Sequence, residues 1–61
     1  MRRTPYKSFS YSLSNDHHGR FISYIYNSKG DLISCMTHRL PEKYAQVCSY
    51  CEEYINREAG A

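Results

Sequence analysis

Three cysteines and one histidine are spaced in pairs that could chelate a metal ion. They form the pattern Cys35-x-x-His38, nine further residues, and Cys48-x-x-Cys51. Thiolate and imidazole ligands in such pairs are typical of structural zinc sites. A bound metal would also stabilise a chain of 61 residues, which is near the lower size limit for independent folding. The alternative is that the cysteines are small hydrophobic residues packed in a core.

The local sequence around each pair favours the packing interpretation. The two residues between Cys35 and His38 include no glycine or proline for a tight chelating turn, and on a continuous strand the two side chains point to opposite faces. Cys48 and Cys51 stand where the apolar spacing of a helix already requires buried side chains. We therefore expect packed thiols and no cofactor, with zinc bound by all four residues as the alternative.

Three segments of the chain predict strands of an antiparallel sheet. Serines alternate with large apolar residues from Lys7 to Leu13, which is the period of a strand with one buried face. The next segment is rich in β-branched and aromatic residues, and a tight-turn sequence ending in Gly30 leads to the third. We expect strands over about residues 6–13, 20–26 and 31–37.

The last third of the chain predicts one amphipathic helix over about residues 41–57. Pro41 suits the first helical position, and Glu42 suits the positive end of the helix dipole. Apolar residues then recur every three or four positions from Tyr44 to Ile55. The expected fold is a single α+β domain of residues 1–61, a three-stranded antiparallel β-meander with one C-terminal α-helix packed on one sheet face, between flexible termini at 1–5 and 58–61.

The lengths of the two turns predict which residues lie under the helix. We take Leu13 to lie opposite Arg20 across the first turn and Tyr26 to lie opposite Asp31 across the second. This register assigns each large side chain to one of the two faces of the sheet. The predicted helix-covered face then carries Phe9, Tyr11, Leu13, Ile22, Tyr24, Ile33 and Cys35. The helix-free face carries Phe21, Ile25, Leu32 and Met36.

These four side chains on the predicted helix-free face suggest a binding surface. One helix covers only one side of a sheet, and a contiguous apolar patch usually marks an interface. The sequence therefore predicts a small non-enzymatic binding protein, an adaptor or a stoichiometric inhibitor or regulator. Its expected partner is another protein, with a second copy in a homodimer as the first to consider.

Nucleic-acid binding is the alternative function. The chain has seven tyrosines and no tryptophan, and tyrosines on a sheet can stack on bases while Arg2, Arg3, Lys7 and Arg20 contact phosphates. However, eight Lys and Arg against six Asp and Glu give a net charge of only +2, and the cations are scattered. The predicted register also places most tyrosines under the helix.

Other classes of function find no support in the sequence. There is no glycine-rich phosphate loop or nucleophile motif, and we expect neither an enzyme nor a small-molecule substrate. The odd number of cysteines and the absence of an apolar leader predict a reduced, cytoplasmic protein. The apolar runs are too short for a membrane span.

Overall fold

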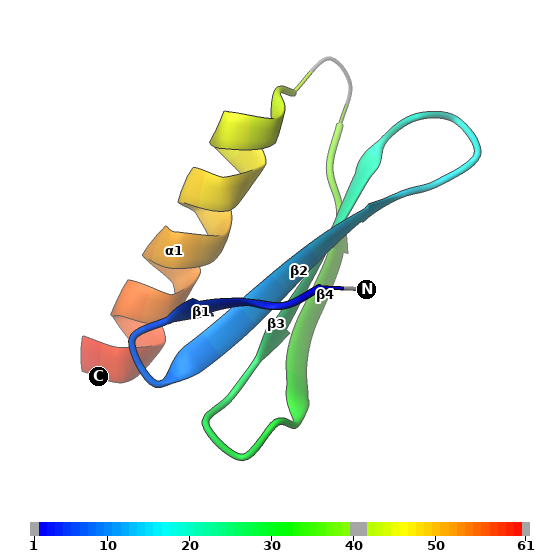
Figure 1. The fold of residues 1–61 in the computed structure, drawn as a ribbon. Helices are drawn as coiled ribbons and strands as arrows, with labels where there is room; N and C mark the ends of the chain where they lie inside the picture. Colours follow the sequence, from blue (N-terminus) through cyan, green and yellow to red (C-terminus); the bar gives the residue numbers. More distant parts are fainter. Residues whose placement is uncertain (1, 40–41, 61) are drawn as a thin grey trace.

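A four-stranded antiparallel sheet and one helix make up the fold. The computed structural model describes residues 2–39 and 42–60. The elements are β1 (Thr4–Tyr6), β2 (Phe9–Asn15), β3 (Phe21–Tyr26), β4 (Leu32–Thr37) and α1 (Tyr44–Gly60). The strands lie in the order β1-β2-β3-β4, and α1 crosses one face of the sheet (Figure 1). The predicted fold class is confirmed, with one strand more than expected.

The additional strand, β1, combines Thr4 and Pro5 from the segment predicted to be flexible with Tyr6, the predicted start of the first strand, and a turn separates it from β2. It pairs with β2 through Thr4 opposite Tyr11 and Tyr6 opposite Phe9. Lys7 takes a positive φ of 56° in the turn between the two strands. Lysine is not a usual residue at such a position, and Pro5 argues against an interior strand. The sequence therefore carries no clear signal for this edge strand.

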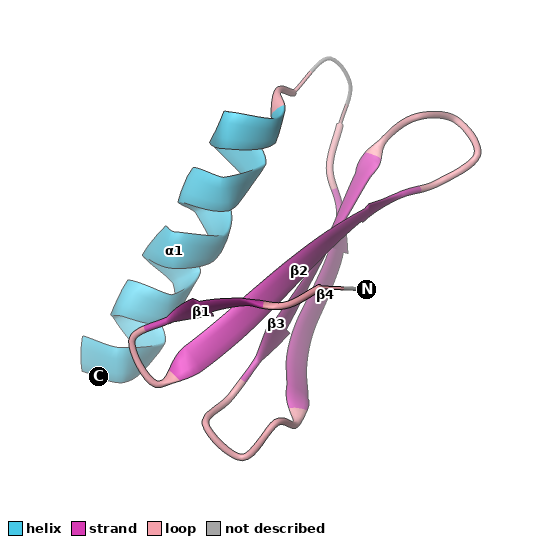
Figure 2. Ribbon diagram, in the orientation of Figure 1, coloured by secondary structure: helices cyan, strands magenta, loops and turns pink. Residues whose placement is uncertain are grey.

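Helix α1 is shifted towards the C-terminus of the chain relative to its prediction. Leu40 and Pro41, the expected entry, lie outside the described residues, and the helix begins at Tyr44. The Lys43 N–H donates to the Gln46 side-chain oxygen at 2.7 Å, which is one of the two hydrogen bonds of a capping box. The helix continues to Gly60, so residues 58–60 are helical rather than a flexible tail. Figure 2 shows the helix as a separate layer beside the four strands.

The β2–β3 hairpin is closed by the carboxylate of Asp16. One oxygen of this carboxylate accepts the backbone N–H groups of His18 and Arg20, both at 2.9 Å. The other oxygen lies 2.9 Å from the guanidinium of Arg20, and Gly19 takes a φ of 82°. Partial desolvation by itself would raise the pKa of Asp16, but these hydrogen bonds and the Arg20 charge hold it below its usual value.

Asn27 closes the β3–β4 hairpin in the same way. Its side-chain oxygen accepts the backbone N–H groups of Lys29 and Asp31, both at 2.9 Å, and Gly30 takes a φ of 86°. The two hairpins therefore use one loop geometry, in which an Asp or Asn is followed three residues later by glycine.

In the observed register, the side chains of β3 and β4 lie on the opposite faces of the sheet from those predicted. Tyr11 lies opposite Ile25 rather than opposite Ile22, a shift of three residues. Because side chains alternate along a strand, an odd shift exchanges the two faces. Ile25 is consequently buried, while Ile22 and Tyr24 lie on the other side of the sheet and are half-buried. The predicted facing is therefore wrong for β3 and β4, whereas Phe9, Tyr11 and Leu13 of β2 face the core as predicted.

The core lies between α1 and the sheet face that carries Tyr11 and Ile25. Its fully buried helical residues are Val47, Cys51 and Ile55, whereas Cys48, which the helical spacing also predicts to be buried, is half-buried. Tyr11 packs with Cys51 and Ile55 and donates its hydroxyl to Glu52 at 2.9 Å. Burial, followed by this hydrogen bond, raises the pKa of Tyr11. The partly buried residues around this core are Tyr6, Phe9, Leu13, Cys48, Tyr50 and Tyr54.

Candidate functional site

The sheet face away from α1, here called the open face, is the main candidate surface. Cross-strand partners share a face, so the pairing of Tyr24 with Ser12 and Cys35 places all three side chains on this side. The large and sulfur-containing side chains of the open face are Ile22, Tyr24, Tyr26, Leu32 and Cys35. Its small side chains on β2 are Ser10, Ser12 and Ser14.

The four residues predicted to bind a partner do not share one surface. Ile25 is 0% exposed beneath α1, and the ring of Phe21 lies 6.0 Å from that of Tyr44, at the first residue of α1. Met36 lies opposite a β3 residue of the helix-covered face and therefore shares that face, although Met36 itself is 42% exposed. Leu32, which is 53% exposed and lies opposite Tyr26, is the member of the set on the open face. The shift in hairpin register explains this error.

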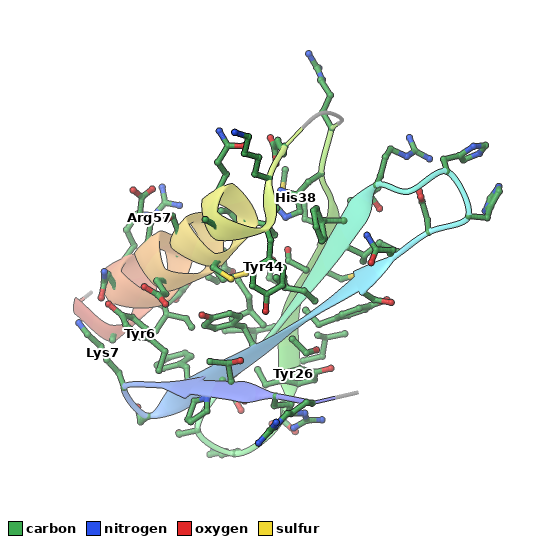
Figure 3. The ribbon with its side chains drawn as sticks, turned by 45° about the horizontal axis from the view of Figure 1, so that its top comes forward. Tyr6, Lys7, Tyr26, His38, Tyr44 and Arg57 are labelled. Carbon is green, nitrogen blue, oxygen red and sulfur yellow. The ribbon has the colours of Figure 1, made fainter. Side chains whose placement is uncertain are left out.

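Arg3 brings a positive charge onto the open face. Its guanidinium carbon lies 3.6 Å from the centroid of the Tyr26 ring, a cation–π contact. Tyr26 lies beside β1 in Figure 3, close to the chain segment that carries Arg3. Strand β1, which the sequence did not predict, is therefore the element that positions this cation.

Of the other three cations proposed for nucleic-acid contacts, Arg20 is already paired and Lys7 lies elsewhere. Arg20 forms the ion pair with Asp16 at the far end of the β2–β3 hairpin. Lys7 lies 6.0 Å from the ring of Tyr6, towards the C-terminal end of α1 (Figure 3). Arg2 is exposed next to Arg3. The four residues do not form a single cluster.

Charge is nevertheless divided between the two layers of the fold. Residues 1–39, which contain all four strands, carry six Lys or Arg against two Asp, a net charge of +4. Residues 40–61, which contain α1, carry two Lys or Arg against four Glu, a net charge of −2. The sheet layer is therefore basic, and the helix layer is acidic.

The four residues of the possible zinc site do not converge. Cys35 is exposed on the open face, whereas Cys51 is buried beneath the helix and Cys48 packs beside it. Within residues 2–39 and 42–60, no three His, Cys, Asp or Glu side chains lie close enough to hold a metal ion. The zinc alternative built on Cys35, His38, Cys48 and Cys51 is therefore wrong. The packing prediction is confirmed for Cys48 and Cys51, but Cys35 is not a core residue.

The three thiols are expected to differ widely in reactivity. Burial is the main cause that raises the pKa of Cys51 to about 11, and the thiolate is the reactive form. We expect one fast-reacting thiol per chain with a chromogenic disulfide reagent, and reaction of Cys51 only after unfolding. The variant Cys35→Ser should lose the fast phase. A fast phase that survives this substitution would contradict the assigned exposure.

Three polar side chains, Ser23, His38 and Glu42, lie in a row at the entry to the helix. The Ser23 hydroxyl is 2.9 Å from His38 Nε2, and a Glu42 carboxylate oxygen is 3.2 Å from His38 Nδ1. The contact between Ser23 and His38 is a hydrogen bond, and Glu42 lies within ion-pair distance of the other ring nitrogen of His38. This is the order of groups that activates a serine nucleophile in hydrolases.

Burial prevents these three side chains from acting on a substrate in the observed conformation. Ser23 is 0% exposed and His38 is 3% exposed, and the described part of the protein contains no pocket. The three residues instead connect β3, the end of β4 and the entry to α1. This group could not be predicted from the expected register, because that register places Ser23 on the wrong face. The four-residue spacing of His38 and Glu42 was the one available signal.

No protein-family model, curated protein or solved structure matches the chain. Among the described residues, no helix is long and apolar enough to cross a membrane. The fold and the surface define a small α+β domain in which one face of a four-stranded sheet is covered by a helix and the other is open.

Proposed function

We propose that the chain is a non-catalytic domain that binds nucleic acid on its open face. The observation that carries this proposal is the position of Tyr24 and Tyr26 on the open face, with the Arg3 guanidinium 3.6 Å above one of the rings. Aromatic rings can stack on bases, and an adjacent arginine can bind a phosphate with two hydrogen bonds.

The distribution of charge supports an anionic partner. The net charge of +4 on the sheet layer attracts a polyanion, and the net charge of −2 on the helix layer directs it to the opposite side. Direct face-to-face pairing of two open faces would bring two basic layers together. Charge therefore favours nucleic acid over self-association through this face.

The small residues of β2 suit close approach of a ligand. Ser10, Ser12 and Ser14 lie opposite the larger side chains of β3, and Ser12 is 2% exposed. The Ser12 hydroxyl is buried and lacks a hydrogen-bond partner among the described residues. Such a group costs about 1–3 kcal/mol, so a rearrangement that provided it with a ligand partner would be favourable.

Fluorescence anisotropy with labelled oligonucleotides tests this proposal. Single-stranded RNA, single-stranded DNA and duplex DNA share the phosphate and base chemistry, and separate titrations distinguish them. We expect Tyr24→Ala to weaken binding by about tenfold, since one stacked base contributes about 1–3 kcal/mol. Tyr44→Ala, which removes an exposed tyrosine from α1, is the matched control and should have little effect.

Salt provides the second readout of the same experiment. Binding should weaken steeply as the salt concentration rises, because phosphate contacts release counterions. Absence of binding to all three nucleic acids, or equal losses in Tyr24→Ala and Tyr44→Ala, would refute the proposal. Equal binding of polyglutamate would show that the surface is a general polyanion site and would also refute it.

Binding of a protein, as an adaptor, inhibitor or regulator, remains the second candidate function. It is favoured by the exposure of Leu32, Ile33 and Met36, three large apolar residues on the edge strand β4. An exposed apolar edge is suited to pairing with another strand. This candidate uses the edge of the sheet, whereas nucleic acid would use the open face.

A further inference from the structure

The two edges of the sheet differ in how they are protected against pairing. The β1 edge is three residues long, contains Pro5, and is flanked by Arg2, Arg3 and Lys7. Short length, proline and cations are the usual means of preventing edge pairing. The β4 edge, Leu32–Thr37, has six residues without a charge, proline or glycine, and all but Ser34 are exposed. Only β1 carries protection.

The hydrogen-bond pattern identifies the free backbone groups of β4. The His38 N–H donates to the Phe21 carbonyl at 2.7 Å, so His38 directs its backbone groups at β3. Narrow and wide pairs alternate along an antiparallel ladder. Met36 and Ser34 therefore also bond to β3, whereas Cys35 and Thr37 direct their N–H and C=O groups away from the sheet.

The β3–β4 hairpin gives the same alternation independently. The Asn27 N–H donates to the Asp31 carbonyl at 2.9 Å, which directs Asn27 towards the β4 side. The register shifts between Ile25 and Tyr26, but the extra residue is on β4, so counting back by two along β3 still places Ile25 and Ser23 among the residues that bond to β4. Their partners are Ser34 and Met36, in agreement with the pattern deduced from His38.

We propose that β4 pairs in antiparallel orientation with β4 of a second copy, around a two-fold axis at Cys35. Residues directly opposite each other on two paired strands lie on the same face of the sheet. This condition is met when Cys35 lies opposite Cys35 of the second copy and Ser34 lies opposite Met36 of the second copy. In this register the outward N–H and C=O groups of the two Cys35 residues bond to each other. No charged side chain lies on β4 to oppose the approach.

Protection of β1 explains why the partner is a single second copy. Pairing through β4 joins the two sheets into one and leaves a β1 strand at each outer edge. Because those edges resist further pairing, the assembly closes as a dimer rather than growing into a fibre. The two-fold axis is perpendicular to the sheet, so both helices lie on one side and both open faces lie on the other.

This inference is independent of nucleic-acid binding and specifies a protein partner as a second copy. A contact of two short strands buries less than the area of a standard stable interface, so the dimer should be weak and depend on concentration. In the dimer the two open faces would form one longer surface.

Sedimentation equilibrium of the native chain and two variants tests the pairing. Cys35→Pro removes the outward N–H without breaking a bond to β3, whereas Cys35→Ala removes the thiol and keeps the N–H. We expect the native chain and Cys35→Ala to dimerise, and Cys35→Pro to dimerise at least about tenfold more weakly. A native chain that is monomeric at millimolar concentration, or a dimer insensitive to Cys35→Pro, would overturn the proposal.

Amide hydrogen exchange of the native chain provides a test that needs no variant. The Ser34 and Met36 amides should be protected at every concentration, because they bond to β3. Protection of the Cys35 and Thr37 amides should rise with concentration as the dimer forms. Exchange at these two amides that does not change with concentration would contradict pairing with a second copy, whatever the outcome of the oligonucleotide titrations.

Discussion

Replacement of Ile25 by aspartate is expected to unfold the domain, whereas the same replacement at Ile22 is expected to leave it folded. Ile25 is 0% exposed and packs with Tyr11, Cys51 and Ile55. An unpaired carboxylate at this position costs several kcal/mol. The total stability of small domains is about 5–15 kcal/mol, and a chain of this length belongs near the lower end.

Ile22 is the matched control because it lies three residues away on the opposite face of the same strand. It is half-buried on the open face, where a carboxylate remains in contact with water. We expect Ile22→Asp to cost about 1–2 kcal/mol. Far-UV circular dichroism and urea denaturation measure both variants. A folded Ile25→Asp together with an unfolded Ile22→Asp would show that the helix covers the other face.

The second large effect is expected for His38→Ala. The substitution removes a buried ring that packs edge-on against Tyr50, with centroids 4.9 Å apart. It also leaves the buried Ser23 hydroxyl without its partner and releases Glu42 from the entry to the helix. The cavity and the unpaired hydroxyl together predict a loss of about 2–4 kcal/mol in the free energy of unfolding.

His18→Ala is the control for this substitution, since His18 is exposed in the β2–β3 loop. Its stability should stay within about 0.5 kcal/mol of the native chain. Urea denaturation at one pH gives both values. Similar stabilities for His38→Ala and the native chain would mean that the row of side chains from Ser23 to Glu42 does not hold the helix entry in place.

The fold class could be predicted because each element carries a strong periodic signal. The alternation along β2 and the spacing of Val47, Cys51 and Ile55 each identify one buried face without reference to the rest of the chain. β1 could not be predicted in this way. A three-residue strand is too short to show a period, and its turn uses a lysine with positive φ.

The facing of the sheet could have been predicted from the two hairpin loops. Asp16 and Gly19 are spaced as Asn27 and Gly30 are, and the structure gives both loops the same hydrogen bonds. Treating the first loop like the second places Asn15 opposite Phe21, which is the observed pairing. A first loop that begins at Ser14, as predicted from the pairing of Leu13 with Arg20, instead moves every residue of β3 to the wrong face.

The candidate site depended on this facing and on β1. Tyr24 and Tyr26 reach the open face only in the correct register, and Arg3 reaches Tyr26 only because β1 pairs with β2. The link between Ser23 and His38 spans two strands and also requires the correct register. Local sequence patterns do not contain such contacts, because they depend on the pairing of distant segments.

The most direct test of nucleic-acid binding by the open face is a nuclear magnetic resonance titration of side-chain signals with the oligonucleotide that binds best. We expect shifts in the Ile22 methyl groups and in the ring protons of Tyr24 and Tyr26. The methyl groups of Ile55, buried beneath α1, and the exposed ring of Tyr44 should remain unchanged. Shifts confined to α1, or no shifts at any of these side chains at saturating nucleic acid, would contradict binding by the open face.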